Sequence, residues 1–264
     1  FPGININDCE RPLNEKGFHD ASVMGKRLHE KQISFDLMLS STAIRALTTC
    51  QLIAAEIEYS LEAILTNKDI YGAEGFPIYA GSPKRLPPEW EKNGPVLNKV
   101  RQQLAVIPGK THTVEFAFGG IGTNAHWDVP RNPWDAQNHR APGGSSSGAG
   151  VSLWEGSASI AFGTDTGGSV RVPASMTGNV GLKTTKGRWS TDLITILSTS
   201  FDTPGILAKS VTDISFGFNA IDPAAKANGS PVIETREING LSLGITKDYF
   251  WDRCSDDVGE TVEN

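Results

Sequence analysis

Hydrophobic positions recur at helical spacing near the start of the chain. Within residues 10–31, apolar side chains lie three and four positions apart, at Ala21, Met24 and Leu28. This pattern predicts an amphipathic helix. The apolar run at 35–41 predicts a short buried strand, and residues 42–57 carry one broad apolar face that predicts a second helix.

Further along the chain, short apolar runs alternate with helical patterns. Helices are predicted at 96–104 and 147–153, and strands at 106–107, 160–162 and 241–246. The proline-rich stretches 83–88 and 223–231 predict loops. Alternation of this kind predicts an α/β fold with a mixed sheet.

Length and charge narrow the class of protein. A chain of 264 residues can bury one substantial core or two small ones. Its net charge of −6 argues against direct contact with nucleic acid. Apolar runs are well short of the roughly 18 residues that a membrane span needs, and we find no secretory apolar region at the start. We therefore expect no membrane partner, and a homo-oligomer is left open.

The cysteines and histidines suggest no metal or cofactor. The three cysteines, Cys9, Cys50 and Cys254, are widely scattered, which favours a reducing, cytoplasmic compartment. The five histidines form no pair at metal-ligand spacing. We expect structural or rim positions for His112 and His126.

Two glycine turns that carry serine are the strongest chemical signal. Ser145 lies in a Gly-Gly-Ser-Ser-Ser-Gly string at 143–148, and Ser169 follows Thr166-Gly-Gly168. Glycine lets the backbone approach a ligand closely, and successive N–H groups in such a turn can bind an anion. A serine there can attack a carbonyl while the N–H groups receive the oxyanion. Asp165 and Arg171 flank the second turn, and we expect them to pair and hold it.

A serine nucleophile needs a base, and Lys68 is a candidate. A lysine that is buried loses the preference for its charged form, so that its pKa falls into the range of a base. Lys68 follows the apolar pair Ile64-Leu65 and precedes the turn residues Gly72 and Gly75.

Residues from about 61 to 250 resemble the amidase signature family. The resemblance rests on Lys68-Asp69, on the Gly/Ser strings at 143–148 and 163–171, and on the stretches 109–124, 130–135, 178–183 and 202–205. It implies a serine amidohydrolase that cleaves a carboxamide C–N bond in a small molecule through an acyl-enzyme.

The resemblance also implies roles for single residues. Ser169 is the implied nucleophile, Ser145 the bridging serine in a cis peptide after Gly144, and Lys68 the base. The implied oxyanion hole is formed by the backbone N–H groups of Thr166, Gly167, Gly168 and Ser169. Gly119 and Gly120 are expected, with Ser145, to contact the substrate.

Residues from about 9 to 58 resemble the phosphohistidine phosphatase branch of the histidine phosphatase family. The strings at 11–17 and 39–46 carry this resemblance, and Arg45 matches a phosphate-binding arginine. An Arg-His nucleophile motif is not found before Glu10, and the first histidine is His19. We therefore expect no phosphatase chemistry, and an Arg45 that is exposed.

The chain is thus predicted to join two segments near Tyr59. Residues 1–58 would form a small phosphatase-like αβα segment, and residues 59–264 an amidase core that is incomplete at its C-terminus. Two alternatives to an active amidase are left open. One is a catalytically inactive chimeric fragment, and the other is a glutamine amidotransferase A-type subunit that supplies ammonia to an aminoacyl-tRNA partner.

Overall fold

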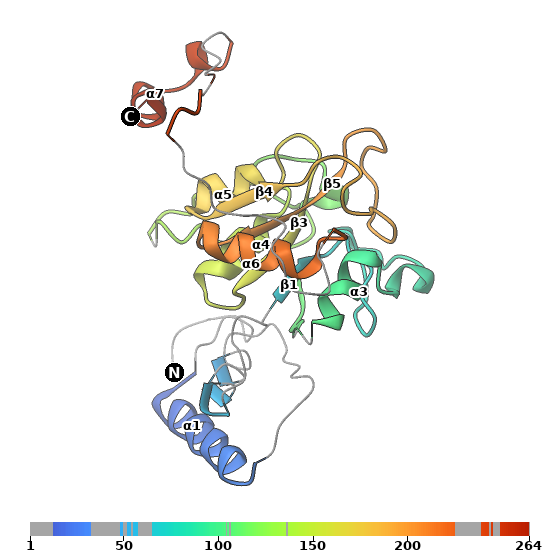
Figure 1. Ribbon diagram of the computed structural model, residues 1–264, viewed down its shortest axis with the longest axis vertical. Helices are drawn as coiled ribbons and strands as arrows, with labels where there is room; N and C mark the ends of the chain where they lie inside the picture. The colour runs from blue at the N-terminus through green and yellow to red at the C-terminus, as the bar shows by residue number, and fades with distance from the viewer. Residues whose placement is uncertain are drawn as a thin grey trace. The chain divides into compact units, whose positions relative to one another are not determined.

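A computed structural model describes residues 13–32, 48–49, 52–53, 55–57, 65–103, 105, 107–135, 137–224, 239–242, 244 and 249–263 (Figure 1). The chain divides into two compact units, 1–233 and 234–264. In the second unit, the short 3₁₀ helix η5 (Trp251–Arg253) precedes helix α7 (Asp256–Glu263). The remaining elements belong to the first unit.

Helix α1 (Glu15–Glu30) begins where the sequence provides a cap. The Asn14 side chain accepts a hydrogen bond from the Gly17 N–H at 2.8 Å, and Glu15 lies in the first turn, where a negative charge is favoured. The Ser22 hydroxyl donates to Glu56. The predicted helix at 10–31 is confirmed for Glu15–Glu30, and the described residues of 48–56 are helical, as predicted.

A mixed five-stranded sheet organises the first unit. Its order is β2 (Lys110–Thr111), β1 (Leu65–Lys68), β3 (Ile160–Asp165), β5 (Thr203–Ala208) and β4 (Val180–Lys183). Strand β1 pairs in parallel with β2 and β3, whereas β5 pairs antiparallel with β3 and β4. The predicted α/β class with a mixed sheet is confirmed.

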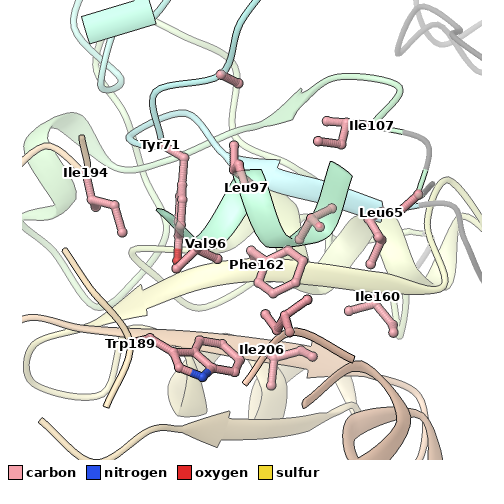
Figure 2. Close-up of a cluster of buried hydrophobic side chains, with 14 of the residues drawn as sticks. Leu65, Tyr71, Val96, Leu97, Ile107, Ile160, Phe162, Trp189, Ile194 and Ile206 are labelled. Carbon is pink, nitrogen blue, oxygen red and sulfur yellow. The ribbon is translucent and has the colours of Figure 1, made fainter. Parts of the chain in front are cut away.

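Helices cover both faces of this sheet because side chains alternate along its strands. Ile160 and Phe162 belong to the cluster that contains α3 (Pro95–Gln102) and α6 (Val211–Ile221), and Ala161 belongs to the cluster of α4 (Ser147–Trp154) and α5 (Arg171–Thr177). Figure 2 shows Phe162 and Ile160 among the side chains of the first cluster. The small side chains of α4 allow its backbone to approach the sheet closely.

Two short 3₁₀ helices, η3 (Pro88–Glu91) and η4 (Glu115–Ala117), lie in loops of the first unit. The predicted loop at 83–88 is correct up to the start of η3. None of the described helices has the length and apolar character to cross a membrane.

Two predicted strands are not confirmed. Ile107 lies outside any strand, and the edge strand β2 begins three residues later, because its ladder is set by the register Asn67↔Lys110. Leu241, Ser242 and Gly244 are also outside strands. The predicted strand at 35–41 and Arg45 lie outside the described residues.

Candidate active site

Strand β1 carries Lys68 toward helix α4. Thr66 and Lys68 have the same parity in the strand, and the Thr66 hydroxyl lies 3.4 Å from Ser152 Oγ of α4. Lys68 is the last residue of β1, and Ser145 lies just before α4. Strand and helix therefore bring the two side chains together.

Lys68 is fully buried and makes two hydrogen bonds. Its Nζ donates to Ser145 Oγ at 2.6 Å and to Thr164 Oγ1 at 3.1 Å. Burial lowers the pKa of Lys68 to about 7, against the opposing effect of the negative charges of Asp202 and Asp165. A substantial fraction of Lys68 is therefore neutral near pH 7.

Ser145 lies in a tightly packed turn. The Gly144–Ser145 peptide bond is cis, as expected, and the Ser145 side chain is fully buried. The Ser145 carbonyl accepts hydrogen bonds from the Val114 N–H at 3.1 Å and the Thr113 hydroxyl at 3.2 Å. A Cβ on Gly144 would lie 2.8 Å from the Gly122 nitrogen, so only glycine fits there.

The Asp165 carboxylate holds the turn that carries Ser169. Arg171 donates to it through Nε and Nη2, both at 3.0 Å, and the Gly168 N–H donates at 2.8 Å. Burial alone would raise the pKa of Asp165, but the Arg171 guanidinium and the N–H donors outweigh it and lower that pKa. The expected pairing of Asp165 with Arg171 is confirmed.

The Ser169 turn is only partly arranged as expected. Because the Gly168 N–H is bonded to Asp165, it is not free for an oxyanion, which leaves Thr166, Gly167 and Ser169. Within the described residues, these three N–H groups have no acceptor, and the Ser169 hydroxyl makes no hydrogen bond. The Ser169 carbonyl accepts from the Ser146 N–H at 3.2 Å, which places the two serine turns side by side.

Two polar residues of this site were not predicted from the sequence. Thr164 is the second acceptor for Lys68, and Asp202 accepts a 2.5 Å hydrogen bond from the Thr166 hydroxyl. Both lie within stretches that resemble the amidase signature. Only the pairing of β3 with β1 and β5 could have assigned their contacts.

Gly119 and Gly120 lie on an exposed loop that touches the Ser145 turn. The Gly120 carbonyl accepts a 2.8 Å hydrogen bond from the Gly144 N–H. An open pocket of about 320 Å³ is formed along this loop, with Phe118 (80% exposed) and Ile121 (63% exposed) among its lining residues. The structure thus brings Gly119 and Gly120 next to Ser145.

The two histidines of the amidase-like stretches have different surroundings. His112 Nδ1 lies 2.6 Å from Ser147 Oγ, and burial lowers the pKa of His112 to about 4. His126 lies at the surface, 3.5 Å from a Glu115 oxygen. In the described part of the chain, no three His, Cys, Asp or Glu residues are grouped as metal ligands.

Comparison with known families agrees with both resemblances. The sequence model of the amidase family matches residues 63–264, and that of the histidine phosphatase superfamily (branch 1) matches residues 6–93. Both resemblances predicted from the sequence are confirmed. The boundary near Tyr59 stays a prediction, since the two matches overlap.

Several relatives with assigned names are similar in sequence. A 2-amino-5-chloromuconic acid deaminase from Comamonas testosteroni is 52% identical over 74% of this chain and 42% of its own length. The A-type subunit of a glutamyl-tRNA(Gln) amidotransferase from Thermoanaerobacter pseudethanolicus is 32% identical over 90% of this chain and 51% of its own length. The chain thus spans about half or less of the length of these relatives.

Solved structures show the same fold. A crystal structure of an amidase superposes with a TM-score of 0.57 at 28% identity, over 81% of this chain and 44% of that one. A peptide amidase in complex with the competitive inhibitor chymostatin superposes with a TM-score of 0.56 at 26% identity, over 89% of this chain and 52% of that one.

Proposed function

Because the chain belongs to the amidase family, we propose that it hydrolyses the C–N bond of a small carboxamide through an acyl-enzyme on Ser169. Ser145 relays the proton and Lys68 is the base. The observation that carries this proposal is the 2.6 Å contact between Lys68 Nζ and Ser145 Oγ, made by a fully buried lysine. A hydroxyl that both donates and accepts is suited to such a relay.

The Lys68–Ser145 contact supports the first part of the proposed proton route. The transfer from Ser169 to Ser145 requires the Ser169 hydroxyl, which makes no hydrogen bond within the described residues, to come within reach of Ser145 when substrate binds. Neutral Lys68 accepts the Ser145 proton while Ser145 accepts the Ser169 proton, and Ser169 Oγ bonds to the carbonyl carbon. The carbonyl π electrons move to oxygen. When the C–N bond breaks, the nitrogen keeps its electron pair and takes a proton back through Ser145. Water then repeats the sequence and releases the acid.

The Ser169 turn supports stabilisation of the oxyanion. The N–H groups of Thr166, Gly167 and Ser169 are available to it, and Gly168 could join only by giving up its bond to Asp165. Removal of one such donor typically slows a reaction about 10²–10³-fold. Asp165 and Arg171 hold the backbone in this arrangement before substrate binds.

The substrate is proposed to enter beside Gly119 and Gly120. Phe118 and Ile121 give this side an apolar wall, which suits a substrate with an unsaturated or apolar carbon chain. The 52% identical relative is named a deaminase of 2-amino-5-chloromuconic acid, whose nitrogen is an amino group. Muconamide, a carboxamide with the same carbon skeleton, is therefore a rational test substrate for amide hydrolysis.

A second candidate is a role as an amidotransferase A-type subunit. The 32% identity to the A-type subunit of a glutamyl-tRNA(Gln) amidotransferase supports it. In that role the chain would release ammonia from glutamine for a partner protein. A catalytically inactive protein is the third reading that the sequence leaves open.

Ammonia release distinguishes these readings. The chain is incubated separately with acetamide, muconamide and glutamine, and the masses of the acid-quenched proteins are measured by intact mass spectrometry. We expect release from one of the first two and a transient acyl adduct on Ser169. Ser169→Ala should abolish both, and Ser175→Ala, on the exposed side of α5, should change neither. Release of ammonia from glutamine alone would favour the amidotransferase role. If no substrate released ammonia, the inactive reading would be favoured.

A further inference from the structure

Asp69 and Lys110 form a largely buried ion pair beside the proposed base. Asp69 directly follows Lys68 in the chain, and Lys110 is the first residue of the neighbouring strand β2. Lys110 Nζ lies 3.3 Å from Asp69 Oδ1, and the two side chains are 8% and 17% exposed. A charged pair withdrawn from water is costly unless further hydrogen bonds satisfy it, so the other contacts of Asp69 indicate its role.

The Asp69 carboxylate accepts hydrogen bonds from a turn at residues 79–81. The Tyr79 N–H lies 3.2 Å from Asp69 Oδ2, and the Gly81 N–H lies 3.5 Å from it. Ala80, between them, is fully buried and has a φ of 53°, and Gly81 has a φ of 72°. A residue other than glycine keeps this left-handed conformation only where its surroundings enforce it. The carboxylate is therefore placed to hold a strained turn.

This turn is bonded to the segment that begins at Thr113. The Ala80 carbonyl accepts from the Phe116 N–H at 2.7 Å. Asn124 Nδ2 donates both to the Gly81 carbonyl, at 2.7 Å, and to the Thr113 carbonyl, at 3.0 Å. A Cβ on Gly81 would lie 2.7 Å from the Thr113 carbonyl oxygen, so the two backbones are in direct contact.

The same segment holds the serine that is proposed to relay the proton. The Val114 N–H and the Thr113 hydroxyl both donate to the Ser145 carbonyl, at 3.1 and 3.2 Å. The position of this carbonyl fixes where the Ser145 hydroxyl lies relative to Lys68 Nζ, 2.6 Å away. A continuous set of contacts thus runs from Asp69 to Ser145.

We propose that Asp69 and Lys110 are positioning residues for Ser145. The Asp69 carboxylate holds the turn at 79–81, the turn holds the segment 113–116, and that segment sets Ser145 Oγ against Lys68. The inference rests on the proposed role of Ser145 as the proton relay.

Lys110 acts by favouring the ionised form of Asp69. Burial raises the pKa of Asp69, and the positive charge of Lys110 is the largest effect that opposes this rise. An ionised carboxylate accepts stronger hydrogen bonds than a protonated one. Without Lys110, the carboxyl group would therefore hold the turn less firmly.

Amide hydrogen exchange followed by NMR tests this path without catalysis. In Asp69→Asn, an amide nitrogen replaces one acceptor oxygen, so we expect exchange of the Tyr79 N–H to be about tenfold faster. Exchange of the Val114 N–H should rise by a similar factor. Lys99→Met, at an exposed position of α3, should change neither. Unchanged exchange at Val114 would overturn the proposal, whether or not the natural chain proves to be an amidase.

Saturation kinetics of Ser169 labelling by a fluorophosphonate separate positioning from loss of structure. Because Ser145 acts in the chemical step, the maximal labelling rate should fall about tenfold in Asp69→Asn, with less than about a twofold change in the half-saturating concentration. Loss of folded protein would instead lower the fraction labelled. A natural maximal rate in a folded Asp69→Asn chain would overturn the proposal.

Variants of Lys110 give an independent comparison, which decides the matter if Asp69→Asn does not fold. Lys110→Met removes the positive charge and should slow labelling and speed exchange at Val114, whereas Lys110→Arg keeps the charge and should retain more of both natural rates. Near-UV circular dichroism verifies that each variant is folded. Natural rates in a folded Lys110→Met chain would contradict the role of Lys110.

Discussion

The Thr166 hydroxyl donates a hydrogen bond of 2.5 Å to Asp202 Oδ1. Asp202 Oδ2 accepts from the N–H groups of Leu197 at 2.8 Å and Ser198 at 3.0 Å. Asp202 is 6% exposed, and this single carboxylate joins the loop before β5 to the turn that carries Ser169. It therefore fixes the position of a residue whose N–H faces the proposed oxyanion.

Asp202→Asn should loosen this connection. The new amide cannot accept from Thr166, Leu197 and Ser198 together, because one side now donates. We expect a free energy of unfolding lower by about 1–3 kcal/mol and labelling of Ser169 by a fluorophosphonate that is about tenfold slower. Denaturant unfolding and the labelling rate measure the two effects. Asp213→Asn, in the first turn of α6, is the control and should not slow labelling.

Thr164→Val should shift the pH dependence of labelling. A hydrogen bond from the ammonium to Thr164 Oγ1 favours charged Lys68, so its removal lowers the Lys68 pKa below about 7. The midpoint of the labelling rate against pH should move to lower pH. Thr164→Ser keeps the acceptor and should keep the midpoint. A midpoint that rose in the valine variant would contradict this role.

Lys68→Met should stabilise the chain in a pH-dependent manner. The unfolded lysine holds its proton up to about 10.5, and the folded one only up to about 7. The unfolded state therefore binds more protons between these values, and the stability of the natural chain rises with pH there. The advantage of the methionine variant should be largest below pH 7 and decline toward pH 10.5. Urea unfolding of both chains at several pH values measures this difference in the free energy of unfolding. A difference that grew with pH would contradict the lowered pKa of Lys68 in the folded chain.

Deletion of residues 1–58 should leave the reactivity of Ser169 essentially unchanged. All five described strands lie after residue 64, as do all residues of the proposed site. Labelling rates of the full and shortened chains are compared at equal concentration. A large loss on deletion, or hydrolysis of a phosphohistidine substrate by the full chain, would show a role for this segment that the sequence does not indicate.

The sequence predicted those helices and strands whose pattern of apolar residues matches the side chains that are buried in the structure. The run of small residues at 147–153 predicted α4, and the apolar residues 160–162 predicted the start of β3. β2 was misplaced because it has only two residues, too few for an alternating pattern. β5 was missed because it is buried on both faces and contains a proline, so it shows neither alternation nor strong strand propensity.

The candidate site was predictable from residue type, but its contacts were not. Lys68 and Ser145 could be named from the glycine turns and the family resemblance, whereas Thr164 and Asp202 required the strand pairing. The Gly168 N–H is another group whose hydrogen-bond partner could not be predicted from the sequence. A glycine in the turn suggests a free donor, but only the structure reveals that the Asp165 carboxylate accepts it.

Labelling by a fluorophosphonate tests the central claim most directly, because it reports an activated serine without a known substrate. The natural chain, Ser169→Ala, Lys68→Met and Ser175→Ala are treated in parallel, and the modified residue is identified by peptide mass spectrometry. The proposal predicts modification of Ser169 in the natural chain and in Ser175→Ala, and none in Ser169→Ala or Lys68→Met. Full labelling of Lys68→Met, or modification of another serine in its place, would contradict it.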